Sequence, residues 1–424
     1  MSWPPRFSTR LLAGLVAVAL LLVAGALVLG RAGEPSGTTV VTVRLWDPSV
    51  AAAYAESFAE FSRAHPGIEV RTNVVPYASY FTTLRTDVAG GGADDIFWLN
   101  NANFAEYADN HRLMAVQPAP EWDPSVVAQF TRGGSVWGVP QLTDAGIAVY
   151  YNADLLAADG VDPAELDSVR WDPDPGVDTL RPLLKRLTHG RQWGYNAAND
   201  LQAIYLNYIG SAGGVFSNGD RFTFDNPQAA GAFRYVVGLI NTDRVAPPAS
   251  DTNDNGDFSR NQFLSGRMAL FQSGTYNLAQ VAEQARFRWG VAMLPTGPAG
   301  RVSVTNGIVA AGNPASRHPD AVRQVLAWLG STRGNAYVGR RGAAIPAVLP
   351  AQRVYFEYWS ARGVDVAPFF RVLDGPRIPA PGGPGFAAGY QAIKPHFDEM
   401  FLGRLPVDQA LAAAQRAANA AAER

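Results

Sequence analysis

Short runs of β-branched and apolar residues alternate, from about residue 39 onward, with stretches in which apolar positions recur every three or four residues. Residues 40–46 (VVTVRLW) predict a strand, residues 51–67 predict a helix that ends at a Pro-Gly pair, and residues 68–75 predict a second strand. The apolar run at 95–100 suits a strand buried in a parallel sheet. Further helices are predicted at 180–187, 200–209, 227–241, 258–264, 276–285, 318–330 and 407–422. This order of elements predicts an α/β fold.

An uncharged run of 20 residues, 11–30, precedes this region and has arginines on both flanks. At about 1.5 Å per residue it would span roughly 30 Å, the thickness of the hydrocarbon core of a bilayer. The arginines before it predict that residues 1–10 are cytoplasmic and that the chain after it is extracytoplasmic. Residues 31–37, rich in Gly, Pro and Ser, predict a tether. We expect residues 11–30 to be a membrane anchor; the alternative is a signal segment whose cleavage leaves a secreted protein.

Composition narrows the classes of function. A chain of 424 residues exceeds a typical domain of ~100 to 200 residues, so we expect two lobes. The net charge of -2 offers no basic field for binding nucleic acid. The sequence has no cysteine, which excludes disulfides, thiolate metal ligands and a lipidated cysteine. No GxSxG, HExxH or phosphate-binding GK[ST] motif occurs and the five histidines are scattered, so we expect neither an enzyme nor a cofactor.

Four passages, the last of them in two parts, share their order and residue types with a known family. The first holds a strand, a helix, a His-Pro-Gly-Ile turn and a strand, and the second a strand that ends in an aromatic residue and Asn. The third holds an aliphatic strand that ends in Tyr-Asn, and the fourth a small-residue turn with an aromatic residue and a return strand. The passages are residues 45–84, 91–118, 137–156, 263–278 and 289–329. In them the chain resembles the extracellular carbohydrate-binding proteins of ABC importers, of the maltose- and glycerol-phosphate-binding type.

The resemblance implies a two-lobed α/β receptor with an interlobe cleft and with lobes that are each discontinuous in sequence. It implies a first lobe of residues 38–138 and 296–333 and a second lobe of residues 139–295 and 334–424. It further implies that a sugar or sugar-like solute is captured by hinge closure and delivered to a membrane permease; we expect a monomer. Family members often carry a lipidated cysteine, whose place the run at 11–30 would take.

A sugar presents apolar C–H faces and a rim of hydroxyls, so its site requires aromatic rings together with Asp, Asn, Gln or Arg in a concave place. Trp46 and Asp47 end the first predicted strand, although a core tryptophan and a helix-capping aspartate fit them too. Trp98 ends the strand at 95–100 or lies buried in it. Tyr276 follows a small-residue turn, where the resemblance places an aromatic platform. The other candidates are Asn100, Asn101, Asn103, Gln141, Asp144, Tyr151, Asn306, Gly307 and Arg377.

Three other interpretations of the sequence are considered beside that of a transport receptor. Residues 251–256 (DTNDNG) match the first half of an EF-hand loop, but position twelve is Gln262, which lacks the required carboxylate, so we expect a capped turn and no metal. A glycan-processing enzyme requires only two carboxylates about 5 to 10 Å apart, which a sequence does not exclude. A surface receptor or scaffold that keeps the fold without transport is the third alternative.

Overall fold

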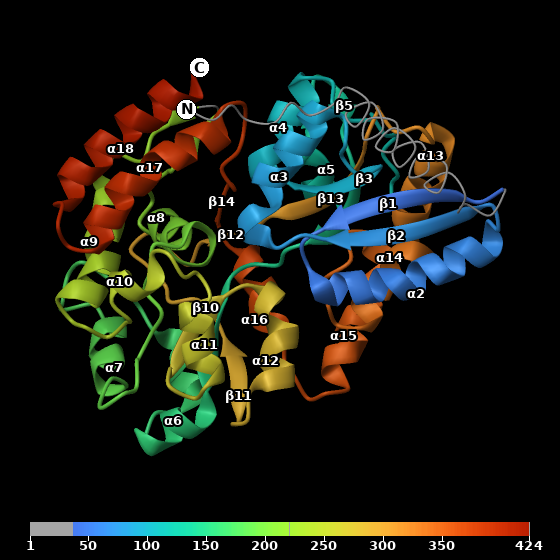
Figure 1. Ribbon diagram of the computed structural model, residues 1–424. Coiled ribbons are helices and arrows are strands. Elements are labelled where there is room, and N and C mark those ends of the chain that lie inside the picture. Colours follow the sequence, from blue (N-terminus) through green and yellow to red (C-terminus); the bar gives the residue numbers. More distant parts are fainter. Residues whose placement is uncertain (1–36, 220, 424) are drawn as a thin grey trace, which may run out of the picture.

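The computed structural model describes residues 37–219 and 221–423, which form two lobes side by side (Figure 1). The first lobe is built on a five-stranded sheet. Its strands, in spatial order, are β2 (Ile68–Val74), β1 (Thr39–Leu45), β3 (Ile96–Asn100), β13 (Gly307–Gly312) and β6 (Val139–Thr143). β1, β2 and β3 are parallel, whereas β13 runs antiparallel to both of its neighbours. The predicted βαβ beginning is confirmed.

Helices cover both faces of this sheet. α2 (Pro48–Ala64), α13 (Pro319–Leu329) and α14 (Thr332–Arg340) pack against one another on one face, and α3 (Tyr77–Gly90) crosses the other. Right-handed crossovers from β1 to β2 and from β2 to β3 place α2 and α3 on opposite faces. Asp47 caps the N-terminus of α2, and its carboxylate accepts two backbone N–H groups of the first turn at 2.7 and 3.1 Å.

The second lobe contains a three-stranded antiparallel sheet in the order β10 (Leu270–Ser273), β7 (Ala148–Asn152) and β11 (Trp289–Ala292). Alternation along β7 sends side chains to two different cores. Val149 enters the large core of the lobe, and Tyr150 enters a smaller core on the opposite face of the sheet. This small sheet is therefore covered on both sides.

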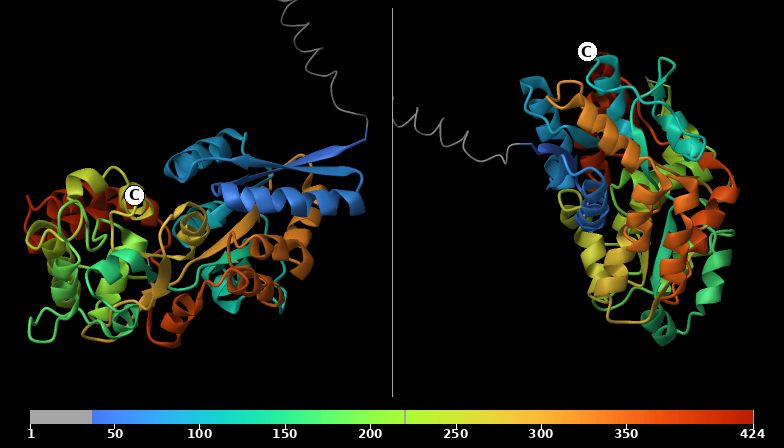
Figure 2. Two further views of the ribbon diagram at one scale, coloured as in Figure 1. Left: turned by 90° about the horizontal axis from the view of Figure 1, so that it is seen from below. Right: turned by 90° about the vertical axis from the view of Figure 1, so that its right-hand side faces the viewer.

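The remaining elements are mostly helical, and the views from below and from the side show them packed around the two sheets (Figure 2). They are α4 (Asn101–Asp109), α5 (Pro124–Gln129), β4 (Thr131–Arg132), β5 (Ser135–Val136), α6 (Ala153–Ala158), η1 (Pro163–Ser168), α7 (Leu180–Arg186), η2 (Leu201–Tyr205), α8 (Leu206–Ser211), β8 (Ser217–Asn218), β9 (Arg221–Phe222), α9 (Pro227–Asn241), α10 (Ala249–Thr252), α11 (Phe258–Leu264), η3 (Thr275–Asn277), α12 (Leu278–Gln284), β12 (Ser303–Val304), η4 (Leu349–Ala351), α15 (Arg353–Ser360), α16 (Ala367–Arg371), η5 (Val372–Asp374), β14 (Arg377–Ile378), α17 (Phe386–Phe401) and α18 (Val407–Ala422). The bounds of α9, α11 and α18 are those that the apolar spacing predicted.

Two crossings between the lobes lie side by side. The chain leaves the first sheet after β6 at Asp144, and it returns from β12 to β13 at Asn306. The backbone N–H of Asp144 donates to the carbonyl oxygen of Asn306 at 2.7 Å. A few residues at the ends of elements are the usual place for a hinge, and this bond holds both connections at the same point.

The packing differs from the expected lobe boundaries in three stretches. Residues 139–143 form β6 of the first sheet, because they pair with β13. Residues 336–351 contribute to the core of the first lobe, where α14 lies against α2. Val302 and Val304 belong to the core of the second lobe, so the return crossing comes after residue 296. An apolar pattern identifies a strand or helix but does not say which of two sheets it joins.

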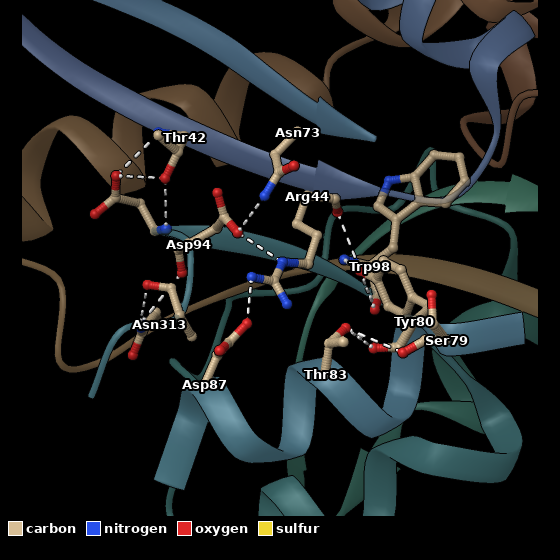
Figure 3. A network of polar contacts seen from close by, with 12 residues as sticks. Thr42, Arg44, Asn73, Ser79, Tyr80, Thr83, Asp87, Asp94, Trp98 and Asn313 are labelled. Atoms are coloured by element: carbon tan, nitrogen blue, oxygen red, sulfur yellow. Dashed lines mark hydrogen bonds and ion pairs between the residues drawn. The ribbon is translucent and has the colours of Figure 1, made fainter. Parts of the chain in front are cut away.

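A buried ion-pair network fixes α3 against the first sheet (Figure 3). The guanidinium of Arg44 on β1 pairs with the carboxylates of Asp87 and Asp94, each at an N–O distance of 2.6 Å. Tyr80 of α3 donates its hydroxyl proton to the carbonyl oxygen of Arg44 at 3.1 Å. These bonds hold Tyr77, the first residue of α3, beside the end of β1.

The expected membrane anchor at residues 11–30 lies outside the described residues. Within residues 37–219 and 221–423, no helix has both the length and the apolar character that a membrane crossing requires.

Candidate functional site

The first lobe contributes an aromatic edge to the interlobe cleft. Tyr77 begins α3, and 58% of its surface is exposed. Its ring lies edge-on to Trp46 at the end of β1, with ring centroids 5.5 Å apart. Its hydroxyl oxygen accepts the side-chain N–H of Asn100, the last residue of β3, at 3.4 Å. Three parallel strands, β1, β2 and β3, thus place two aromatic side chains and an amide at the carboxyl edge of the sheet, where open α/β sheets bind ligands.

The second lobe presents Tyr276 from the short turn η3, which follows β10, and 42% of this residue is exposed. Its ring lies directly over Gly274, because a Cβ atom at position 274 would lie 2.3 Å from the ring atom Cε1. The hydroxyl of Tyr150 on β7 donates to the carbonyl oxygen of Gly274 at 2.7 Å. The turn is therefore tied to the sheet, and the glycine is required for the position of the ring.

Two carboxylates from different parts of the chain come close to both exposed tyrosines. Burial raises the pKa of Tyr77 and of Tyr276 above the usual value, and the charges of Asp144 and Asp200 raise both further. The two rings are exposed to solvent, yet they are desolvated by the protein around them. This combination is expected of side chains that line a concave surface, and it places residues of both lobes around one cleft.

Asp144 carries the most shifted carboxyl group of the cleft. Burial raises its pKa to about 7, although a hydrogen bond from Nε2 of Gln202 at 3.1 Å acts in the opposite direction. Burial also raises the pKa of Asp200, whose carboxylate caps η2 and accepts the N–H of Ala203 at 2.8 Å. Near neutral pH the cleft therefore contains a carboxyl group that can donate as well as accept hydrogen bonds.

A cavity of about 210 Å³ lies beside Tyr276 within the second lobe. Its lining is mostly polar and includes Asn196, Asp200, Gln272 and Asn277. The amide of Asn196 bonds both backbone groups of Gln272, at 2.7 and 2.9 Å, so this part of the wall is fixed.

The structure brings four of the candidates from the sequence to the cleft. Tyr276 and Asp144 lie in it, and Trp46 and Asn100 lie at its first-lobe edge. Asn103 donates to Oδ1 of Asn100 at 2.8 Å and so orients that amide. Their contact with a ligand stays a prediction.

Two candidates belong to the core. Trp98 and Gln141 are both 0% exposed. The indole N–H of Trp98 donates to the hydroxyl oxygen of Tyr54 at 3.3 Å, and that hydroxyl donates to Oε1 of Gln141 at 2.5 Å. Both side chains are buried with their polar groups satisfied inside the protein, so in this structure they belong to the core and do not line the cleft.

Three further candidates are engaged by the protein itself. Asp47 caps α2, which is the second of the two roles that the sequence allowed for it. The amide of Asn101 donates to the carbonyl oxygen of Ala380 at 2.9 Å. The guanidinium of Arg377 donates to the carbonyl oxygen of Leu373 at 3.0 and 3.2 Å. These contacts give each side chain a structural role.

The last three candidates occupy close-packed backbone positions. Tyr151 on β7 covers Gly290, where a Cβ atom would lie 2.3 Å from the tyrosine hydroxyl. Asn306 accepts the N–H of Gly307 with its own Oδ1 at 3.0 Å. A Cβ atom at Gly307 would lie 2.8 Å from Val126, so this strand passes close to α5. Asn306 remains beside the cleft through its backbone bond to the other crossing.

Four residues of the cleft escaped the sequence reasoning: Tyr77, Asp200, Gln202 and Tyr390. Burial raises the pKa of Tyr390 to about 12, and the charges of Asp200 and Tyr77 contribute to that shift. Tyr77 follows the end of a strand, as Trp46 does, so its position in the sequence could have identified it as a candidate. Only the fold brings the other three to the same place.

Only the first two residues of the calcium-like segment 251–256 are helical, and residues 253–256 form the turn that follows. α10 includes Asp251 and Thr252, and Lys394 pairs with Asp254 at 3.3 Å. In the part of the chain that the structure describes, no group of three or more His, Cys, Asp or Glu side chains is placed to hold a metal ion.

Comparisons with known proteins agree with this architecture. A sequence model of the bacterial extracellular solute-binding protein family matches residues 47–336. A protein of Deinococcus radiodurans, named a probable ABC transporter-binding protein, is 28% identical over 218 residues, which are 49% of this chain and 50% of that protein. The match thus spans half the length of that relative.

Solved structures cover more of the chain. The crystal structure of M. tuberculosis UspC is 71% identical, covers 90% of this chain and 100% of its own, and superposes with a TM-score of 0.74. An ABC substrate-binding protein of Listeria monocytogenes, solved in complex with cycloalternan, is 19% identical with a TM-score of 0.80, over 90% of this chain and 98% of its own. The second likeness shows the fold alone.

Proposed function

The chain belongs to the bacterial extracellular solute-binding proteins, and on that premise we propose that it is the extracytoplasmic substrate-binding subunit of an ABC importer for a sugar or sugar-like solute. The name of the Deinococcus relative and the cycloalternan bound by the Listeria protein agree with this proposal. It acts as a receptor that performs no chemistry on its ligand.

One observation carries the choice of ligand class: an exposed tyrosine from each lobe lies close enough to the same pair of carboxyl groups for their charges to raise its pKa. The ring of Tyr276 offers an apolar face for the C–H groups of a sugar, and Tyr77 offers a second one. Asp144 and Asp200 supply acceptors for the hydroxyls around the sugar ring. Flat aromatic surfaces combined with a few placed polar groups are what a saccharide requires.

The proposed mechanism is closure of the lobes about the two crossings. A ligand that touches Tyr77 and Tyr276 makes its full set of contacts only when both lobes enclose it, so it shifts the population toward the closed state. The contact between Asp144 and Gln202 already joins the crossing to the second lobe. The permease of the importer would then recognise the closed form.

The receptor would be a monomer held at the outer face of the membrane by residues 11–30. The native protein should then fractionate with membranes, resist release by salt and retain its N-terminal residues. A soluble extracellular protein whose mature N-terminus lies near residue 27 or 31 would contradict the anchor and support cleavage.

A thermal-shift panel of mono-, di- and trisaccharides, polyols and glycerol-phosphate compounds tests the function on the purified full-length chain. A bound ligand at 100 times its dissociation constant should stabilise the protein by about 2.7 kcal/mol. Turnover of a glycan in the same panel would instead indicate an enzyme. No shift with any compound would favour a surface receptor that does not transport sugars.

A further inference from the structure

Exposed arginines gather on one face of the molecule, where α14 contacts both α2 and α15. Glu56 and Glu60 lie one turn apart on α2, and α14 supplies a partner to each of them. Arg341 pairs with Glu56, and Arg333 pairs with Glu60, which also accepts the hydroxyl proton of Tyr337. Both glutamates of this face are therefore already paired with an arginine.

Three further arginines on this face carry a charge that no carboxylate balances. Arg63 lies in the last turn of α2, Arg340 ends α14, and Arg362 follows α15. None of the three forms an ion pair with any residue that the structure describes. The guanidinium of Arg340 lies over the ring of Tyr337 at 4.9 Å from its centroid, and that of Arg362 lies over Tyr358 at 3.5 Å. Stacking on a ring holds a guanidinium in place without cancelling its charge.

The charged residues form one continuous patch. Tyr358 packs against Gly342, where a Cβ atom would lie 2.2 Å from the tyrosine ring, so Arg362 is held beside the end of α14. Arg353 and Glu357 of α15 pair with each other and add no net charge. We call the patch the basic face; it consists of Arg63, Arg333, Arg340, Arg341 and Arg362 with Glu56 and Glu60. Five arginines against two glutamates give it a net charge of +3, whereas the whole chain carries -2.

The basic face lies at the end of the lobe where the described chain begins. The backbone N–H of Thr39 donates to the carbonyl oxygen of Gly67 at 2.8 Å, in the turn that follows α2. The start of β1 and this end of α2 lie side by side (Figure 1). Seven residues, 31–37, separate this point from the proposed anchor, and fully extended they reach at most about 25 Å. The surface of a membrane that holds residues 11–30 would thus lie within about 25 Å of the end of α2 that carries Arg63.

We propose that the basic face binds the anionic headgroups of the membrane that anchors the chain, so that the first lobe lies against the bilayer. The proposal rests on the anchor at residues 11–30 in the proposed function. A guanidinium binds a phosphate through two parallel N–H···O bonds, and each arginine near an anionic surface shifts the equilibrium toward the bound state roughly 5-fold. Because the tether keeps both surfaces close, three uncompensated charges suffice for docking.

The sequence has no cysteine, so an introduced cysteine carries a fluorescent label at a single chosen position. In the full-length chain, Ala59→Cys places the label on the exposed side of α2 within the basic face, and Gln409→Cys places it on α18 of the second lobe. Each labelled chain is inserted into nanodiscs that contain a lipid with a spin-labelled headgroup, which quenches a nearby fluorophore. The bilayer is phosphatidylcholine, alone or with about 30% phosphatidylglycerol.

The label at position 59 should be quenched more strongly in the discs with phosphatidylglycerol, and the label at position 409 should be quenched equally in both. Raising the salt concentration to about 0.5 M should remove the difference at position 59, because the Debye length falls to roughly 4 Å. Arg63→Gln, Arg340→Gln and Arg362→Gln together should lower the ratio of docked to free lobe roughly 100-fold. The three corresponding substitutions to lysine should preserve docking, because they keep the charge.

The matched control is the combination of Arg191→Gln, Arg267→Gln and Arg416→Gln. These arginines are exposed on the second lobe, and their removal changes the net charge of the chain by the same amount. Quenching at position 59 should stay as in the chain that keeps all its arginines. Because neither set of substitutions touches the cleft, the affinity for a sugar found in the thermal-shift panel should be unchanged in both.

The outcomes separate this proposal from the proposed function. A full-length chain that does not insert into nanodiscs would contradict the anchor and the docking together, whereas sugar binding is tested by the panel independently of both. Insertion with equal quenching at position 59 in the two lipid mixtures would refute the docking alone, and so would an equal loss in the control combination. If lipid charge has no effect but loss of the three arginines lowers sugar uptake by cells that contain the permease, the basic face would contact an acidic loop of the permease, and the membrane proposal would be refuted.

Discussion

Replacement of Tyr276 by alanine should separate ligand binding from stability. Burial of an aromatic side chain removes about 200 Å² from water, and 42% of this residue is free to be covered by a ligand, which is about 84 Å². At about 25 cal/mol per Å² the lost transfer free energy is about 2 kcal/mol, or roughly 30-fold in the dissociation constant. The ring rests on Gly274 and is not enclosed by a core, so the unliganded protein should lose less than the ~3 to 5 kcal/mol typical of aromatic deletions in cores.

The assay is titration calorimetry with the sugar identified in the panel, together with urea unfolding in its absence. Tyr276→Phe should keep most of the affinity, because the ring face remains. Phe356→Ala is the matched control: Phe356 is 37% exposed and lies on α15, outside the cleft, so its removal should not affect binding. Unchanged affinity in Tyr276→Ala would remove this ring from the site and refute the area argument.

The other predictions concern the carboxyl groups and the core. Burial raises the pKa of Asp144 from 3.8 to about 7, so between these values the folded state holds a proton that the unfolded state has released, and stability falls as pH rises. Asp144→Asn should remove this dependence of the unfolding free energy on pH, and at pH 8 the variant should be more stable than the wild type by up to ~4 kcal/mol. Urea unfolding of both proteins at pH 5 and 8 measures the difference, and an equal change with pH in the two proteins would contradict this. Trp98→Ala should cost about 3 to 5 kcal/mol in urea unfolding, and a loss under ~1 kcal/mol would contradict its core position. Asp94→Asn removes one of the two carboxylates paired with the buried Arg44, which keeps Asp87, and should cost about 1.5 to 3 kcal/mol, whereas the exposed Glu69→Gln should cost under ~1 kcal/mol; similar losses in both would show that burial does not set the difference.

The elements with regular apolar spacing were predictable from the sequence, and the choice between sheets was not. The spacing in residues 227–241 and 407–422 predicts α9 and α18 with their observed bounds, because a helix that buries one face repeats every 3.6 residues. β6 is a short apolar strand that either sheet could accept. Its partner β13 lies more than 150 residues later, and local pattern holds no information about that pairing.

The positions of the candidate site residues were likewise predictable only in part. Tyr276 was predictable because a glycine turn before an aromatic residue leaves the ring outside. Trp98 and Gln141 were not, because a polar or aromatic residue near a strand end points either to the cleft or to the core, and here Tyr54 from α2 satisfies both of them. Asp200 became a cleft residue only through the packing of η2 against β10.

The discontinuity of the first lobe bears on how the protein is made. The hydroxyl of Ser57 on α2 donates to the carbonyl oxygen of Gly334, 277 residues later, and the core of this lobe extends to Ala351. At synthesis rates of about 5 to 20 residues per second, α2 waits roughly 15 to 60 s for these partners to be made. Until β13 (Gly307–Gly312) has been made, β6 has no partner in the sheet and one side of β3 has no neighbour. The nascent chain therefore cannot complete its N-terminal lobe first, and it depends on protection of that strand edge until about three-quarters of its length exists.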